Sequence, residues 1–207
     1  MTTTEDLAAR KIEVEIRAAE LAIEKGRFDL LEKIEEYENR TARLYRFTFD
    51  VDSDSIITAV EWLDRMVTTP DVPAIMAFSS FGGSAFDGLA LFDAMEAARS
   101  SGLDLTTICS GYTASMASIL MQAGTTRLAT SHAWFHIHEP AVGMSYAKTS
   151  GFRDETRLLE GLWDQGIEIF ANRSKLTARQ IRDRFERKEE WLTASEALKL
   201  GFVDGIV

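Results

Sequence analysis

The spacing of apolar residues along this chain changes near residue 43. Between residues 4 and 40, apolar residues recur at spacings of mostly three to five, in a background rich in Glu, Lys and Arg. This spacing predicts an amphipathic helix that breaks or bends at Gly26. We expect its apolar stripe to pack on its own domain or on a sister subunit. The alternative is an arm that docks a partner. We therefore divide the chain into a helical extension, residues 1–40, and a main domain, residues 41–207.

After residue 43, short apolar runs alternate with helical patterns. Strands are predicted at residues 44–51, 74–78, 105–109, 126–129 and 133–137. Helices are predicted at residues 53–67, 86–99, 113–123, 152–174, 178–188 and 194–200. Ser53 is expected to cap the first of these helices. Capping boxes begin the last two helices, formed by Thr177 with Gln180 and by Thr193 with Glu196. Repeated strand–helix units imply right-handed crossovers and a largely parallel sheet, which is the α/β class.

Composition narrows the classes of function. The 207 residues suit one domain, or one domain with an appendage, and 45% of them are hydrophobic. A net charge of −10 disfavours nucleic acid and anionic membranes as partners. The single cysteine, Cys109, allows no disulfide within the chain. The chain begins without a signal-peptide pattern and has no apolar run of about 20 residues, so we expect a cytoplasmic protein.

A serine in small-residue surroundings is the first candidate for chemistry. Ser115 lies between Ala114 and Ala117, in the first turn of the helix predicted from residue 113. Free N–H groups and the helix dipole favour negative charge at that position. A serine hydroxyl is a weak nucleophile unless a base takes its proton. Taken alone, Ser115 is more simply interpreted as a residue that caps or fills a tight helix start.

The chain has three histidines, His132, His136 and His138. His136 and His138 share one face of a predicted strand, because side chains alternate along a strand. This spacing is compatible with a metal pair, but no third ligand lies nearby at a clear spacing. His138 comes where the strand gives way to Glu139 and Pro140, which suits a general base. His136 is interpreted as a structural histidine.

Two further segments complete the candidate chemistry. Gly82 and Gly83 lie between a predicted strand and a predicted helix, where a backbone N–H can point into a site without a side chain in the way. Such a donor contributes about 3 kcal/mol to an oxyanion, although a plain tight turn has the same sequence. The charged run at residues 186–190 is the best source of an acid to orient the imidazole. Its spacing alone selects no single carboxylate, and a solvated helix end is the simpler interpretation.

Together these segments resemble the ClpP family, the proteolytic subunit of the Clp serine protease. Residues 79–84, Ser-Ser-Phe-Gly-Gly-Ser, correspond to that family's Asn-Ser-Pro-Gly-Gly turn. The other similar segments are residues 86–95, 106–116 with Thr-Thr-Ile-Cys-Ser-Gly-Tyr-Thr-Ala-Ser-Met, 135–140 with Phe-His-Ile-His-Glu-Pro, and 191–204. The resemblance covers about residues 43–207. Each motif is weak alone, but the five occur in the family's order.

The resemblance implies a catalytic triad. Ser115 matches the family's nucleophile, and His138 matches its base. The family places an Asp two residues before the aromatic residue of the last motif, and Glu189 occupies that position here. A glutamate can serve in the same way with a longer reach. Glu190 or Asp183 would substitute if the local register differs.

The resemblance also implies an oxyanion hole. Its donors would be the backbone N–H groups of Gly83 and Met116, and Gly82 and Ser84 would contact substrate in the same turn. Phe81 stands where the family has Pro, which is a departure in this turn. No metal or organic cofactor is implied.

The architecture implied by the resemblance is a ClpP/crotonase-like fold of repeated strand–strand–helix units. A protruding helical handle, about residues 141–174, would interlock two seven-membered rings, giving a heptamer or tetradecamer. The implied function is serine endopeptidase activity on peptides or unfolded proteins, with ATP used only by a separate Clp-type ATPase. The family's loop that contacts this unfoldase has no counterpart in residues 1–40.

Three alternatives remain open at this stage. The chain could be a scaffold or regulatory ring subunit that has lost efficient chemistry, as the altered turn and Glu189 would allow. It could be a phage- or prophage-type protease that matures capsid proteins. A crotonase-type hydratase or isomerase acting on acyl-CoA shares the overall fold, but it does not need the Ser115–His138 pair. The sequence fixes neither the natural substrate nor the ring size.

Overall fold

The computed structural model describes residues 43–141 and 149–207, together with residues 17, 21, 22 and 24–26. The chain divides into two compact units, residues 1–42 and 43–207. The described residues of the first unit are helical and exposed, and Gly26 is among them. The rest of the predicted N-terminal helix lies outside the described residues, as do residues 142–148 of the predicted handle.

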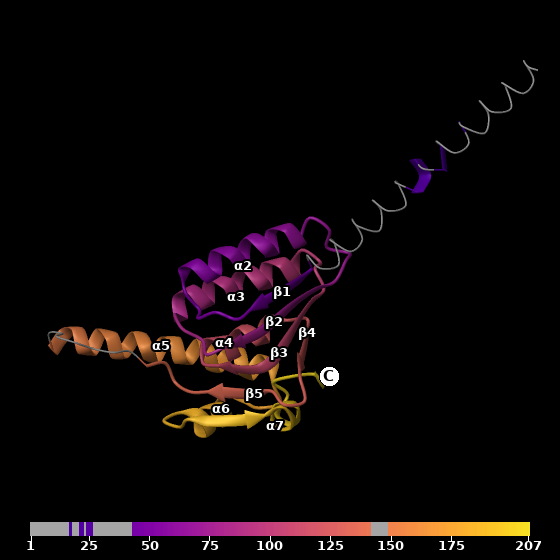
Figure 1. The fold of residues 1–207 in the computed structure, drawn as a ribbon. Coiled ribbons are helices and arrows are strands. Elements are labelled where there is room, and N and C mark those ends of the chain that lie inside the picture. Colours follow the sequence, from indigo (N-terminus) through magenta and orange to yellow (C-terminus); the bar gives the residue numbers. More distant parts are fainter. Residues whose placement is uncertain (1–16, 18–20, 23, 27–42, 142–148) are drawn as a thin grey trace, which may run out of the picture. The chain divides into compact units, whose positions relative to one another are not determined.

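Strands and helices alternate through residues 43–207 (Figure 1). The strands are β1 (Leu44–Phe47), β2 (Ala74–Ser80), β3 (Leu105–Ala114), β4 (Thr126–Ala129), β5 (Trp134–Ile137), β6 (Glu190–Thr193) and β7 (Gly205–Ile206). The helices are α2 (Ser53–Met66), α3 (Ala85–Ser100), α4 (Met116–Leu120), α5 (Thr149–Arg173), α6 (Ala178–Phe185) and α7 (Ala194–Leu200), with a short 3₁₀ helix, η1 (Met121–Ala123). The alternation and the mainly parallel pairing confirm the predicted α/β class.

One sheet joins these strands, and β3 is its branch point. Parallel pairs run in the order β1-β2-β3-β4-β7. The first part of β3, from Thr106 to Cys109, pairs with β4, whereas its last residues, Tyr112 to Ala114, pair in parallel with β5. Gly111 lies between the two parts with a φ of 94°, a backbone conformation that glycine adopts readily. The two ends of β3 therefore belong to different strand pairs.

Local capping explains where several helices begin. The capping boxes predicted at Thr177 and Thr193 are both present. The prediction that Ser53 caps α2 is wrong, because Asp52 occupies that position. The Asp52 carboxylate accepts a hydrogen bond from the Ser55 N–H at 2.8 Å, and the Ser55 hydroxyl accepts one from the Asp52 N–H at 3.1 Å. This pair of polar residues thus places the N-cap of α2 at residue 52, one residue before the position expected.

The start predicted for the helix at residues 113–123 is wrong. Thr113 and Ala114 belong to β3, where they pair with Phe135 and His136 of β5. The helix α4 begins only at Met116 and is continued by η1. Pairing with a strand some 20 residues away overrides the helical pattern of the small residues, so Ser115 precedes the first turn of the helix.

The strand β6 was not predicted from the sequence. It begins at the last residue of the charged run, and it pairs antiparallel with β5, with Ile137 opposite Glu190 and Phe135 opposite Leu192. Leu192 is fully buried, while Trp191 beside it is 43% exposed. Four residues carry too short an alternation to predict a strand by themselves. The pairing with β5 supplies the hydrogen bonds that make it one.

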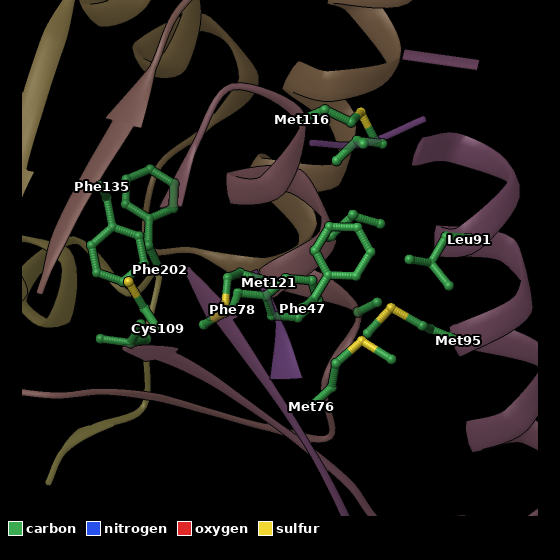
Figure 2. Packing of buried hydrophobic residues seen from close by; sticks show 14 of the residues in the cluster. Phe47, Met76, Phe78, Leu91, Met95, Cys109, Met116, Met121, Phe135 and Phe202 are labelled. Atoms are coloured by element: carbon green, nitrogen blue, oxygen red, sulfur yellow. The ribbon is translucent and has the colours of Figure 1, made fainter. Parts of the chain in front are cut away.

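A single hydrophobic cluster fills the space between the sheet and the helices (Figure 2). Phe47 and Phe78 from neighbouring strands have ring centroids 5.5 Å apart, and both side chains are fully buried. Met76 and Met95 reach the same core from β2 and α3 (Figure 2). The core thus fixes β2 and β3, the strands from which the glycine turn and Ser115 follow.

The long helix α5 is only partly packed on this body. Trp163, Ile167 and Phe170 in its second half are buried. Its first half extends beyond the other elements (Figure 1), and there Leu158 is 45% exposed. The apolar stripe of α5 is therefore longer than the surface that covers it within residues 43–207.

Replacement of Phe78 by Ala should destabilise the fold strongly. Phe78 is fully buried, so truncation leaves a cavity and should lower the free energy of unfolding by about 3–5 kcal/mol. Phe49→Ala is the matched control, because Phe49 is 57% exposed, and it should cost less than about 0.5 kcal/mol. Urea denaturation at one fixed protein concentration measures both. Equal losses for the two variants would contradict the placement of Phe78 in the core.

Candidate active site

Ser115 forms the turn between β3 and α4 in a strained backbone conformation. Its φ is 53° and its ψ is −128°, which costs a non-glycine residue about 1–3 kcal/mol. The Ser115 N–H donates to the carbonyl oxygen of His136 at 2.9 Å, and its own carbonyl oxygen accepts from the Ser118 N–H at 2.9 Å. The Ser115 side chain makes no capping hydrogen bond to α4. Strain of this kind, held by neighbouring hydrogen bonds, is concentrated at functional sites.

His138 directly follows β5, as expected for a histidine at a strand end. Because Ala114 pairs with His136, Ser115 and His138 leave two adjacent parallel strands at the same edge. Both residues line one cavity of about 370 Å³. The rings of His136 and His138 stack with centroids 4.9 Å apart, which agrees with their predicted common face. The structure thus brings together the serine and the imidazole that the sequence singled out.

Glu189 reaches these imidazoles from the residue before β6. The antiparallel register pairs Ile137 with Glu190 and, continued by one residue, sets Glu189 opposite His138. One carboxylate oxygen of Glu189 lies 3.7 Å from Nδ1 of His138, and the other lies 2.9 Å from Nε2 of His136. The Glu189 side chain is 74% exposed. The carboxylate therefore faces both histidines from the solvent side.

The two other candidate carboxylates have different partners. Both oxygens of Glu190 accept from Nε of Arg184, at 3.0 and 3.1 Å. Asp183 faces Arg179 at 3.6 Å on α6. Of the three acids that the sequence left open, only Glu189 lies beside the imidazoles in the described part of the chain.

The glycine turn packs directly against Ser115. Gly82 and Gly83 both have positive φ, 92° and 148°. A Cβ on Gly82 would lie 2.6 Å from the carbonyl oxygen of Ala114 and 2.8 Å from the backbone nitrogen of Met116. Only glycine allows this approach, which sets the turn beside the start of α4.

Backbone hydrogen bonds hold this turn in place. Val51 donates its N–H to the carbonyl oxygen of Gly82 at 2.8 Å and accepts from the Ser84 N–H at 2.7 Å. Neither bond uses the N–H of Gly83. Ser84 also caps α3, accepting from the Asp87 N–H at 3.3 Å. Gly83, Ser84 and Met116 line the same cavity as Ser115.

The remaining walls of the cavity are mostly apolar. Leu89 of α3 and Ile119 of α4 line it. The apolar residues of α5 that line it are Leu158, Leu159, Leu162 and Trp163. The sequence predicts the helix that carries these residues, but it did not identify them as cavity residues. Their helical spacing was visible, but nothing local indicated that the stripe would face Ser115.

Burial sets the electrostatics of His136. Its side chain is 12% exposed, and burial, followed by the neighbouring His138, lowers the pKa of His136 below its ordinary value, although Glu189 acts in the opposite direction. The imidazole also stacks on Trp191 of β6, with centroids 4.5 Å apart. His136 is therefore neutral near pH 7.

The described residues contain neither a cluster of metal-binding side chains nor a membrane-spanning helix. No group of three or more His, Cys, Asp or Glu side chains is arranged there to hold a metal ion. No helix there is long and apolar enough to cross a membrane.

An α/β sheet whose strand ends bring a serine, an imidazole and a carboxylate around one cavity is typical of a hydrolase. The family model described as Clp protease matches residues 14–207. The ATP-dependent Clp protease proteolytic subunit of Porphyromonas gingivalis is 34% identical over 160 residues, covering 76% of this chain and 69% of the relative. The ATP-dependent Clp protease proteolytic subunit 2 of Prochlorococcus marinus (strain NATL2A) is 31% identical over 157 residues, covering 75% and 76%. This chain belongs to the Clp protease family, and it is a ClpP-like peptidase.

A methyl group on Gly82 should destabilise the site. Gly82→Ala adds a Cβ into backbone atoms and strains a positive φ, so the free energy of unfolding should fall by about 1–3 kcal/mol. Gly161→Ala is the control, because a Cβ there meets nothing within 4 Å on α5. It should raise stability by up to about 1 kcal/mol, since Ala favours helix. Chemical denaturation of both variants tests the close approach, and unchanged stability of Gly82→Ala would contradict it.

Proposed function

We propose that this chain is a serine endopeptidase that hydrolyses peptide bonds through an acyl-enzyme on Ser115. The observation that carries the proposal is that Ser115, whose backbone is strained, lines the same cavity as His138. His138 takes the hydroxyl proton as Oγ of Ser115 bonds to the carbonyl carbon. His138 then gives that proton to the leaving amine as the C–N bond breaks. Water, activated by the same imidazole, next hydrolyses the ester and frees Ser115.

Glu189 is the proposed third member of the triad. Its role is to orient His138 and to stabilise the imidazolium that forms during attack. The separation of 3.7 Å from Nδ1 is longer than a hydrogen bond. Such contacts are often long before substrate binds and tighten in the complex. Glu190 accepts hydrogen bonds from Arg184, which supports Glu189 as the carboxylate that orients His138.

The oxyanion hole is proposed to use the N–H groups of Gly83 and Met116. The close approach of Gly82 to the start of α4 supports this, because it sets the turn beside the serine. Each donor would stabilise the tetrahedral oxyanion by about 3 kcal/mol. Gly82 and Ser84 would contact the backbone of the substrate in the same turn.

The proposed substrates are peptides or unfolded proteins with an apolar side chain before the scissile bond. The leucines of α5 that line the cavity support this preference, because an apolar side chain gains free energy by leaving water there. No metal or organic cofactor enters the proposed steps.

We extend the proposal to a homo-oligomer, with a heptameric ring or a pair of rings as the expected form. The exposed half of the apolar stripe on α5 supports it, because a second subunit would bury that stripe. The relatives are called ATP-dependent, which is the basis for proposing a Clp-type ATPase as partner. Residues 1–40 do not resemble the ATPase-contacting loop of the family, so we assign them no part in that docking. A cytoplasmic location is part of the same proposal.

A second candidate is a ring subunit that keeps the fold but has weak chemistry. The observation favouring it is that Glu189 lies nearer to His136 than to His138.

A fluorophosphonate probe should label the assembled protein at one residue. Replacement of Ser115 by Ala should abolish labelling and lower cleavage of a fluorogenic peptide by about 10⁴-fold or more, because no other group supplies the nucleophile. Ser131→Ala, in an exposed turn, is the matched control and should retain both signals. Peptide cleavage that survives in Ser115→Ala would contradict the proposal. Absence of labelling in the unaltered oligomer would favour the scaffold.

Neutral substitution of the three acids should identify the triad carboxylate. Glu189→Gln should lower kcat by about 100- to 10,000-fold, because His138 loses the charge that orients it. Glu190→Gln and Asp183→Asn are controls that leave that charge in place and should change kcat little. Steady-state peptide cleavage by the three variants measures this. A larger loss in either control than in Glu189→Gln would move the assignment to that residue.

A further inference from the structure

The side chain of His136 has no part in the proposed steps, yet it lies among the groups that do. It shares one face of β5 with His138, and its ring stacks with that histidine and with Trp191, at centroid distances of 4.9 and 4.5 Å. The interplanar angles are 21° and 20°, so both neighbours stack on it. Two flat neighbours fix the plane of the His136 ring.

The Nε2 atom of His136 lies close to the carboxylate of Glu189. This Nε2 atom lies 2.9 Å from one oxygen of the carboxylate, while the other oxygen lies 3.7 Å from Nδ1 of His138. The first separation has the length of a hydrogen bond, although Nε2 of His136 makes none of good angle in this state.

We propose that His136 is a positioning residue that holds the Glu189 carboxylate in place for His138. This inference depends on the proposed serine peptidase function and goes beyond it by assigning the second imidazole. Glu189 needs such a support because it is 74% exposed and precedes its strand. Among the described residues it forms no ion pair with a lysine or arginine, and the two imidazoles are its neighbours.

A neutral imidazole suits this role. With its proton on Nε2, His136 donates to the carboxylate without neutralising it. The full negative charge of Glu189 then remains available to stabilise the imidazolium of His138. Burial and the neighbouring His138 lower the pKa of His136, which keeps it neutral near pH 7.

The backbone of His136 has a separate task that substitution preserves. Its carbonyl oxygen accepts from the Ser115 N–H at 2.9 Å and from the Ser118 hydroxyl at 3.1 Å. Any side chain at position 136 keeps this carbonyl. Side-chain variants therefore test the hold on Glu189 without removing the bonds that fix the nucleophile.

The first experiment compares His136→Phe with His136→Gln in the assembled protein. Phe keeps a flat ring but loses the donor, so kcat for a fluorogenic peptide should fall by about 10- to 100-fold with KM unchanged. Gln can donate to a carboxylate, and it should restore most of the lost kcat. The control is His132→Gln, an exposed histidine of the turn before β5, which should behave as the unaltered protein. Native mass and circular dichroism check assembly and folding of each variant.

A double-mutant cycle with Glu189→Gln decides how His136 acts. If it acts through the carboxylate, His136→Phe should change kcat by less than about twofold in the Glu189→Gln background. An equal loss in both backgrounds would overturn the proposal, because it would mean a packing effect independent of Glu189. A rise in KM with unchanged kcat would overturn it as well.

The rate of fluorophosphonate labelling separates this inference from the proposed function. Labelling of Ser115 that is slowed in His136→Phe and recovered in His136→Gln supports both. Normal labelling in His136→Phe, with a reactive Ser115, overturns only the positioning role. No labelling of the unaltered protein overturns both.

Discussion

The branching of β3 at Gly111 is the constraint on which the candidate site depends. A strand in a sheet has one neighbour on each side. On one side of β3, the neighbour is β4 along the first part of the strand and β5 along its last residues. The positive φ of Gly111 allows the change of direction. Because the last residues of β3 pair with β5, the Ser115 N–H is hydrogen-bonded to the backbone of His136. Ser115 therefore lines the same cavity as His138.

The antiparallel pairing of β6 with β5 brings a carboxylate to the candidate site. Parallel pairing alone brings a hydroxyl and an imidazole together, but the acid arrives from about 50 residues further along the chain. The register of β5 and β6 sets Glu189 against the two histidines and leaves Glu190 to Arg184. A shift of one residue would exchange the two glutamates, so strand register decides which carboxylate faces the imidazoles.

The helix α5 connects the site to assembly. Its second half is anchored in the core, whereas the leucines of its first half line the cavity and stay partly exposed. One continuous apolar stripe thus serves three surfaces: the core, the proposed substrate pocket and a face available to another subunit. The apolar pattern is the same along the helix, and only its neighbours distinguish these surfaces.

The sequence by itself determined what short-range physics controls: the α/β order, the capping boxes at Thr177 and Thr193, and the common face of His136 and His138. It also singled out Ser115, His138 and the glycine turn as neighbours, through the order of motifs. Only the tertiary structure decided where β3 ends, that β6 exists, and which of three acids faces the imidazoles. The reason is that caps and periodicity depend on residues three or four apart, whereas strand pairing and register depend on partners 22 to 59 residues away.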